Sequence, residues 1–239
     1  MRVLGRLGFT SLTAALVLPL CSVPALAPAQ AEVTPRSIGG VDVALHPHTR
    51  QVVTVNHRTG DHATVAFWRL GDGRWQRELV ARDGRIGYGG LVAPTERRQG
   101  TGTTPLGTTK LISSFGRHSR DEFWDLPYRR VEQGDYWVED NASDHYNRYR
   151  NKARGGFRWW LPSSDTNSSE RLRDYPRQYE FSIVTSYNRA QVRHRGAGIF
   201  VHVNGSGATA GCVSAPRWFL RKLMVRLQPG QVPLMAVGR

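Results

Sequence analysis

The stretch QVVTVNHRTGDHATVAFWRL, residues 51–70, decides the fold class. Its two arms, residues 51–55 and 62–70, are rich in β-branched and aromatic side chains, which favour strands. Residues 58–61 between them, Arg-Thr-Gly-Asp, predict the turn of a β-hairpin. Two further turns, each containing an Asp-Gly pair, are predicted at residues 70–74 and 81–85. Short strands joined by tight turns predict a mostly β fold.

The rest of the chain contains one long irregular segment and several regular ones. Residues 121–176 are polar and rich in Trp, Tyr, Arg and Asn, which predicts a long excursion over the surface. Strands are predicted at residues 181–187, 198–203 and 232–237. A helix capped by Ser214 is predicted from about Pro216. Its apolar face would consist of Phe219, Leu220, Leu223, Met224 and Leu227.

Residues 1–31 have the pattern of a signal peptide, with two arginines before an apolar run and small residues around a final A-x-A site. Cys21 follows a leucine, where a lipoprotein signal has Gly, Ala or Ser, so we expect cleavage without lipidation. We therefore expect an exported protein with a linker at residues 32–50 and one folded domain at residues 51–239. The alternative is an uncleaved N-terminal anchor.

The chain is strongly basic, with a formal net charge of +14 at pH 7. The excess is concentrated in residues 148–195, which hold 11 basic and 4 acidic side chains. Such a surface attracts polyanions. The aromatic side chains there fall in no nucleic-acid recognition motif. For an exported protein we therefore expect anionic wall polymers or lipid headgroups as partners, and no nucleic acid. The alternative is a solvated basic face without a partner.

Cys212 is the one cysteine that remains once residues 1–31 are removed. An exported protein meets an oxidising compartment, where an unpaired thiol is open to unwanted disulfides and oxidation. Cys212 precedes the predicted helix, whose positive N-terminal end would lower the pKa of the thiol. We therefore predict a nucleophile, with the amides of Gly211 and Cys212 as an oxyanion hole. The alternative is a buried cysteine that acts as a small apolar side chain.

His202 lies in a predicted strand ten residues before Cys212. A strand, a glycine-rich turn and a helix start would bring the two side chains together, so His202 is the predicted general base. No Asp or Glu follows Glu180 in the sequence. The imidazole is therefore expected to be oriented by a backbone carbonyl or by a carboxylate from far upstream. The alternative is a structural histidine.

Two other kinds of site lack essential partners. Residues 205–210 match the dinucleotide pattern G-x-G-x-x-A, but no acidic residue follows at about 20 positions to hold a ribose. His46 and His48 form an H-x-H pair, but the chain has no H-E-x-x-H motif and no second cysteine beyond residue 31. We expect neither a nucleotide nor a metal.

Three segments of the sequence carry a family resemblance. The first is residues 87–116, where GTGTTPLGTTKL at residues 100–111 is similar to the pattern G-D-x-x-T-P-x-G-x-F-x-L. The second is YWVEDNASDHYN at residues 136–147. The third joins GAGIFVH at residues 196–202 to TAGCVS at residues 209–214. Together they resemble the L,D-transpeptidase catalytic domain, the YkuD-type domain of bacterial cell-wall enzymes. Ala210 stands where the common family pattern has histidine.

The resemblance implies a YkuD-like β-sandwich catalytic domain over residues 51–239, with a short helix after the nucleophile and no metal or organic cofactor. Cys212 would accept an acyl group and His202 would act as the base. The implied substrate is a peptidoglycan stem peptide, which is cleaved between the L-centre of its third residue and D-alanine. The expected substrate contacts are Thr209, Ser214, Tyr146 and Asn147, with Arg148 and Arg150 beside them.

These observations predict an exported, cell-wall-associated acyltransferase that cross-links peptidoglycan through a Cys212 acyl-enzyme. Two alternatives stay open. One is a carboxypeptidase, in which water and not an amine resolves the acyl-enzyme. The other is a non-catalytic wall-binding module that uses the basic surface. Intact Cys212 and His202 favour an enzyme. No feature of the sequence predicts an oligomeric state.

Overall fold

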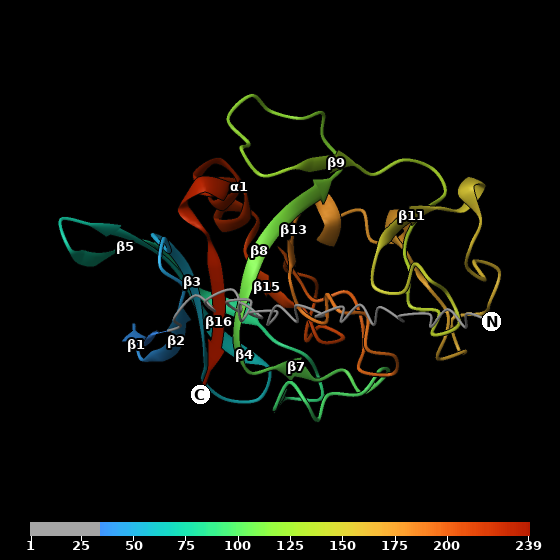
Figure 1. Cartoon of the computed structure of the whole chain (residues 1–239), viewed down its shortest axis with the longest axis horizontal. Helices are drawn as coiled ribbons and strands as arrows, with labels where there is room; N and C mark the ends of the chain where they lie inside the picture. Colours follow the sequence, from blue (N-terminus) through green and yellow to red (C-terminus); the bar gives the residue numbers. More distant parts are fainter. Residues whose placement is uncertain (1–33) are drawn as a thin grey trace, which may run out of the picture. The chain divides into compact units, whose positions relative to one another are not determined.

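The computed structural model describes residues 34–239, and the predicted signal peptide lies outside them. The described chain is mostly β, as predicted. Its main sheet consists of β3 (Gln51–His57), β4 (His62–Gly71), β5 (Arg74–Arg85), β8 (Gly107–Gly116), β9 (Tyr128–Arg130), β13 (Phe181–Thr185), β14 (Phe200–Val203), β15 (Val213–Ala215) and β16 (Leu234–Gly238). The strand order is β13-β14-β15-β5-β4-β3-β16-β8-β9. Because β13 also pairs with β8, the sheet closes into a barrel-like ring (Figure 1).

The hairpin predicted from residues 51–70 is the antiparallel pair of β3 and β4, in which Val53 lies opposite Phe67. The connecting turn lies between His57 and His62, as predicted. The next turn, from β4 to β5, contains Asp72 and Gly73 with positive φ angles of 49° and 71°. Such angles suit the tight turn of a hairpin, and Asp and Gly tolerate them.

The prediction of a turn at residues 81–85 is wrong. The strand β5 continues to Arg85 and stays paired with β4 to its end. The register shifts opposite Thr64, where β5 carries one extra residue. Arg82 and Asp83 therefore form a β-bulge inside a long strand, and Gly84 pairs with Ala63 beyond it, because the partner strand extends far enough to continue the pairing.

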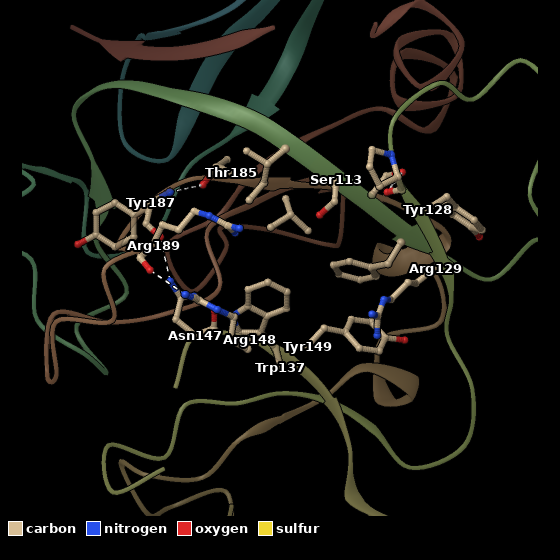
Figure 2. A pocket seen from close by; sticks show the side chains of 15 residues that line it. Ser113, Tyr128, Arg129, Trp137, Asn147, Arg148, Tyr149, Thr185, Tyr187 and Arg189 are labelled. Carbon is tan, nitrogen blue, oxygen red and sulfur yellow. Dashed lines mark hydrogen bonds between the residues drawn. The ribbon is translucent and has the colours of Figure 1, made fainter. Parts of the chain in front are cut away.

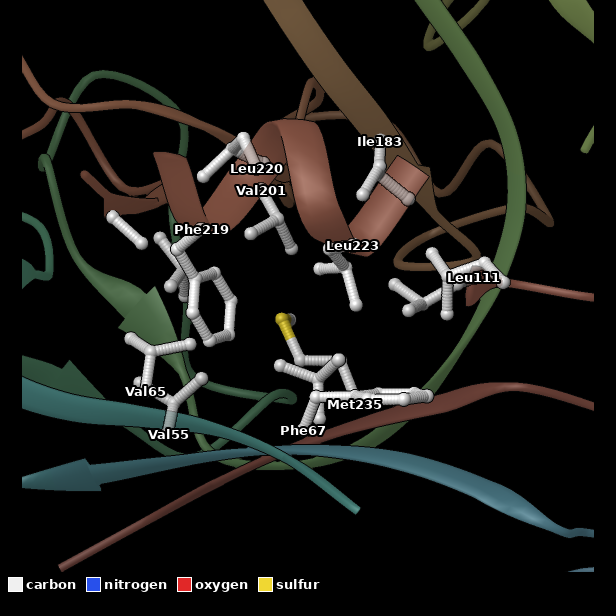
Figure 3. Packing of buried hydrophobic residues seen from close by; sticks show 14 of the residues in the cluster. Val55, Val65, Phe67, Leu111, Ile183, Val201, Phe219, Leu220, Leu223 and Met235 are labelled. Atoms are coloured by element: carbon white, nitrogen blue, oxygen red, sulfur yellow. The ribbon is translucent and has the colours of Figure 1, made fainter. Parts of the chain in front are cut away.

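The helix α1 (Arg217–Arg226) packs against the main sheet (Figure 3). Its apolar face is the one predicted from the sequence, and it shares a core with side chains such as Val55, Phe67 and Met235. Ser214 does not cap this helix. Pro216 occupies the N-cap position, and the Ser214 hydroxyl donates a hydrogen bond to Asn204 Oδ1 at 2.8 Å.

Along β14 and at the start of β15, successive side chains point to opposite faces of the main sheet. Val201 and Val213 belong to the core under α1, whereas their neighbours Phe200 and Cys212 belong to a second apolar cluster. The other buried members of this second cluster are Phe115, Trp137, Tyr146, Leu172, Tyr179, Val184 and Ala197. The sheet therefore has α1 on one face and Cys212 on the other.

Residues 121–176 form a small lobe and not only a surface excursion. A three-stranded sheet in the order β11-β10-β12 builds it, and several of its aromatic side chains are buried, among them Tyr136, Trp137 and Phe157. Apolar packing of these rings accounts for the order of a segment that is polar on average. The elements of the lobe are β10 (Asp135–Trp137), β11 (Tyr149–Asn151), β12 (Glu170–Arg171) and the 3₁₀ helices η1 (Lys152–Arg154) and η2 (Leu172–Asp174). β9, in the same part of the chain, belongs to the main sheet, and the 3₁₀ helix η3 (Gln178–Glu180) follows the lobe before β13.

The prediction of a linker at residues 32–50 is wrong for residues 34–50, which the structure describes. The strands β1 (Thr34–Ile38) and β2 (Val41–Leu45) form an antiparallel hairpin. The hairpin is held by apolar contacts, because Ile38, Val41 and Val43 are buried in one cluster with Val52 of β3 and Leu234 of β16. This hairpin is part of the folded domain.

Two short strands, β6 (Leu91–Val92) and β7 (Thr104–Pro105), pair in parallel. A bridge between Gly87 and Thr209 connects the start of this segment to the loop before Cys212. The 3₁₀ helix η4 (Pro229–Gln231) precedes the last strand, β16. None of the helices in the described part of the chain is long and apolar enough to cross a membrane.

Candidate active site

Cys212 lies in the wall of a large cavity, in the loop that enters β15. The cavity has a volume of about 700 Å³, and Cys212 is 9% exposed. The thiol donates a hydrogen bond to the carbonyl of Gly198 at 3.0 Å, and Sγ accepts one from the N–H of Phe200 at 3.3 Å. A contact to a carbonyl requires the proton on sulfur, so this is the resting thiol and not the thiolate.

The pKa of Cys212 is raised, which contradicts the predicted activation by the helix. Burial raises this pKa, and the nearby charge of Glu170 raises it further. The field of a helix terminus falls off within about one turn. The strand β15 lies between Cys212 and the start of α1 at Arg217, and α1 packs on the opposite face of the sheet. The helix end therefore does not reach the sulfur.

His202 lies on β14, two residues after Phe200, so both side chains project from the same face of the strand. It is 7% exposed and lines the same cavity as Cys212. Its Nδ1–H donates a hydrogen bond to the carbonyl of Val203 at 2.9 Å. Nε2 therefore keeps its lone pair and can act as a base. Of the two kinds of orienting partner predicted, the structure has the backbone carbonyl.

His202 and Cys212 form a neutral pair at rest. Burial lowers the pKa of His202 to about 4, and burial raises the pKa of Cys212. The ring of Tyr179 packs edge-on against the imidazole, with centroids 5.5 Å apart. No hydrogen bond among residues 34–239 joins His202 directly to Cys212. Any reaction of this sulfur as a nucleophile therefore requires loss of the thiol proton, and Nε2 of His202 offers a free lone pair in the same cavity.

Thr104 fixes the loop that carries Cys212. It is fully buried, and its hydroxyl accepts a hydrogen bond from the N–H of Gly87 at 2.8 Å and donates one to the carbonyl of Gly211 at 2.8 Å. Gly211 has a φ of +128°, and an added Cβ would lie 2.7 Å from a guanidinium nitrogen of Arg97. Glycine is therefore required beside the cysteine. The T-P element found in the sequence supplies the threonine that holds this backbone.

The amide of Gly211, a predicted oxyanion donor, already has a hydrogen-bond partner. Its N–H donates to Thr209 Oγ1 at 3.1 Å, and the Thr209 hydroxyl donates to the carbonyl of Cys212 at 2.6 Å. The Thr209 side chain must therefore turn away before this N–H can bind an oxyanion. Thr209 also lines the cavity, which is the position that a substrate contact requires.

Five charged residues line the cavity and were not predicted from the sequence: Arg97, Glu139, Glu170, Arg171 and Asp174. Glu139 and Glu170 are its two glutamates. Burial raises the pKa of both carboxyl groups, and the charge of Glu170 raises that of Glu139 further. Tyr179 donates a hydrogen bond to Glu170 at 2.5 Å, which opposes the rise for Glu170. Glu139 could have been found as the acid of the second resemblance segment. Arg97 and Glu170 belong to no motif.

Tyr146 and Asn147 are buried and do not line the Cys212 cavity, and their contact with a substrate stays a prediction. The Tyr146 hydroxyl donates to the side chain of Gln99 at 2.8 Å. The Asn147 side-chain oxygen accepts from the indole N–H of Trp137 at 2.9 Å and from the N–H of Gly198 at 3.0 Å. Its amide donates to two backbone carbonyls. Asn147 therefore joins the lobe to the backbone beside Cys212.

Ser214, Arg148 and Arg150 were also predicted to contact the substrate, and this too stays a prediction. Ser214 is fully buried on β15. The guanidinium group of Arg150 donates to two nearby backbone carbonyls, and that of Arg148 donates to the carbonyls of Asn147 and Arg189. None of the three residues lines the Cys212 cavity.

Within residues 34–239, no group of three or more His, Cys, Asp and Glu side chains is arranged to hold a metal ion. The H-x-H pair, His46 and His48, lies between β2 and β3. His57, the next histidine, contacts the carbonyl of Gly60 at 2.9 Å through Nε2.

No protein-family model and no curated protein matches this chain. Among solved structures, one described as the structure of Bdellovibrio bacteriovorus Bd1075 is similar, with 12% sequence identity and a TM-score of 0.40. The alignment covers 80% of this chain and 47% of the other, so this chain spans about half the length of that protein.

Proposed function

We propose that the chain is an exported cysteine acyltransferase of the L,D-transpeptidase type, with a YkuD-like catalytic domain that acts on peptidoglycan stem peptides. The observation that carries the proposal is the placement of a thiol and a carbonyl-anchored neutral imidazole, Cys212 and His202, in one cavity. Their chemistry is that of a nucleophile with its base. The substrate class comes from the resemblance of the sequence.

Hydrogen bonds between the three resemblance segments support the proposal. Thr104 of the first segment donates to the carbonyl of Gly211, which precedes the cysteine in the third. Asn147 of the second segment accepts from the N–H of Gly198, whose carbonyl holds the Cys212 thiol. Segments far apart in the sequence therefore meet around one sulfur atom.

In the proposed reaction, Cys212 Sγ attacks the carbonyl carbon of the third stem residue while its proton passes to His202 Nε2. The tetrahedral intermediate collapses, His202 returns the proton to the departing nitrogen, and D-alanine leaves. The product is a thioester between the shortened stem and Cys212. An acceptor amine then attacks the thioester and gives a proton to His202, which restores the thiol and forms a new amide bond.

The carboxyl groups of Glu139 and Glu170 favour an amine as the acceptor. Burial raises the pKa of both groups, and the charge of Glu170 raises that of Glu139 further, so the pair holds a proton more readily than isolated glutamates. An amine arrives as an ammonium ion at neutral pH, and one ionised carboxylate of this pair would bind it. The same carboxylate would take the proton that the amine must lose before it attacks. Water needs no such partner to bind.

The test is to incubate the chain from Glu32 onward with purified tetrapeptide stems and to follow the products by mass spectrometry. Release of D-alanine with a cross-linked dimer supports transfer, whereas release without a dimer supports hydrolysis. The matched control is Cys212→Ala, with a thermal melt to show that it is folded. If the wild type leaves the stems untouched, or the control also releases D-alanine, the proposal fails. Glu139→Gln should reduce dimer formation more than D-alanine release.

A further inference from the structure

A second cavity lies apart from Cys212, between the main sheet and the lobe (Figure 2). Its volume is about 280 Å³, just below the usual range of about 300–1,000 Å³ for small-molecule sites. Ser113 of β8 and Thr185 of β13 line one side, and Trp137 and Tyr149 of the lobe line the other. Asn147 and Arg148, which the sequence predicted to lie at the substrate, line this cavity, whereas Cys212 and His202 do not.

Three arginines, Arg129, Arg148 and Arg189, line the second cavity, and none of its lining residues is acidic. Within residues 34–239 none of the three forms an ion pair. Burial lowers the pKa of Arg148, and the charge of Arg189 lowers it further. The two guanidinium groups therefore repel each other, and an anion between them would relieve this repulsion.

The arginines hold different positions around the cavity. In Figure 2, Arg148 and Arg189 lie near Tyr187, and Arg129 lies on the other side beside Tyr149. The guanidinium of Arg129 stacks over the Tyr149 ring at 5.3 Å from its centroid. Arg148 uses part of its group on two backbone carbonyls. Arg189 is exposed, and its guanidinium donates no hydrogen bond within the described chain, so its donors are available to a ligand.

The floor of the second cavity is apolar. Phe115, Trp137 and Val184 line it, and the rings of Phe115 and Trp137 pack edge-on against Phe200 at 5.1 Å and 4.8 Å between centroids. This aromatic layer separates the second cavity from Cys212, whose sulfur lies against the backbone of Phe200. An inorganic ion would leave such a floor without contacts. The lining suits a ligand with an apolar body and an oxyanion.

We propose that this cavity is a binding site for a small organic anion, in which arginines hold a carboxylate or phosphate group and the aromatic floor holds an apolar body. The site is independent of the proposed acyltransferase activity, since no residue of the Cys212 cavity lines it.

The probes that test this site are phenyl phosphate and benzoate, with benzyl alcohol and inorganic phosphate as controls. Binding is measured by calorimetry, and its position by the NMR signal of the Trp137 indole N–H, assigned with Trp137→Phe. At least one of the two aromatic anions should bind about tenfold or more tightly than either control. The tighter of the two identifies the preferred oxyanion. Equal binding of benzyl alcohol, or no shift of the Trp137 signal by either anion, overturns the proposal.

Arginine variants provide the second readout. Arg129→Gln and Arg189→Gln change exposed side chains, and each should weaken binding of the preferred anion by about tenfold. The matched control is Arg221→Gln, an exposed arginine on α1 that lines neither cavity. Thermal melts establish that all three variants are folded. If both cavity variants bind the anion as tightly as the control does, the arginines do not form the site and the proposal is wrong.

Discussion

Replacing Thr104 by valine tests how the loop that carries Cys212 is held. Valine keeps the shape of the side chain but removes the hydroxyl, which leaves the N–H of Gly87 and the carbonyl of Gly211 without their buried partner. Each unsatisfied buried group costs about 1–3 kcal/mol. We expect a loss of about 3 kcal/mol in the free energy of unfolding, which is about 6–12 °C in Tm for a domain of this size. D-alanine release should fall as well, because the backbone beside the nucleophile loses its anchor.

The matched control for this change is Thr109→Val. The hydroxyl of Thr109 is also buried, but it has no hydrogen-bond partner. Its removal leaves no group unsatisfied, so the free energy of unfolding should change by less than about 0.5 kcal/mol or rise. Calorimetry on the two variants and the wild type gives the comparison. Equal melting temperatures for the two variants would refute the role assigned to Thr104.

Three more predictions follow from the buried groups around the site. The folded-state pKa of His202, about 4, lies below the unfolded value of about 6.5, so protonation favours the unfolded chain. The free energy of unfolding should therefore fall by up to about 3 kcal/mol between about pH 6.5 and pH 4, and in urea titrations His202→Asn should lack this part of the fall. Burial keeps the Cys212 thiol protonated, so iodoacetamide should alkylate it slowly near neutral pH. The alkylation rate should rise about tenfold with each pH unit. A rate that reaches a plateau before about pH 8 contradicts this prediction. Asn147→Ala should cost about 4 kcal/mol of stability, because it removes four hydrogen bonds at a buried site. If Asn147→Ala raises the KM for D-alanine release but leaves the free energy of unfolding in urea unchanged, Asn147 is a substrate contact and not a structural residue.

Local patterns in the sequence predicted the local elements well. Runs of β-branched and aromatic residues around a turn predicted the β3–β4 hairpin, and the helical spacing of Phe219, Leu220 and Leu223 predicted the buried face of α1. The pairing of β13 with β8, which closes the ring, joins residues about 70 positions apart and leaves no local signal. The hairpin of β1 and β2 was missed because its three inward side chains are too few to stand out in the sequence.

The composition of the site was predicted better than its electrostatics. The ten-residue interval between His202 and Cys212 led correctly to one cavity. The state of the thiol depends on which face of the sheet it occupies and on Glu170, which is 42 positions away in the sequence. Distance along the chain does not determine either of these. The burial of Asn147 was not foreseen, because a polar side chain in a polar segment is usually exposed, whereas here a set of buried partners satisfies its hydrogen bonds.

The mass of the intact protein shortly after mixing with a tetrapeptide stem tests the proposed chemistry most directly. The mechanism predicts an adduct on Cys212 with the mass of the stem minus D-alanine, because a thioester forms as D-alanine leaves. The adduct should be absent from Cys212→Ala and should disappear when an acceptor amine or hydroxylamine is added. An adduct of the same mass on the Cys212→Ala variant, or release of D-alanine by a wild type whose mass never changes under rapid quenching, would contradict a Cys212 acyl-enzyme.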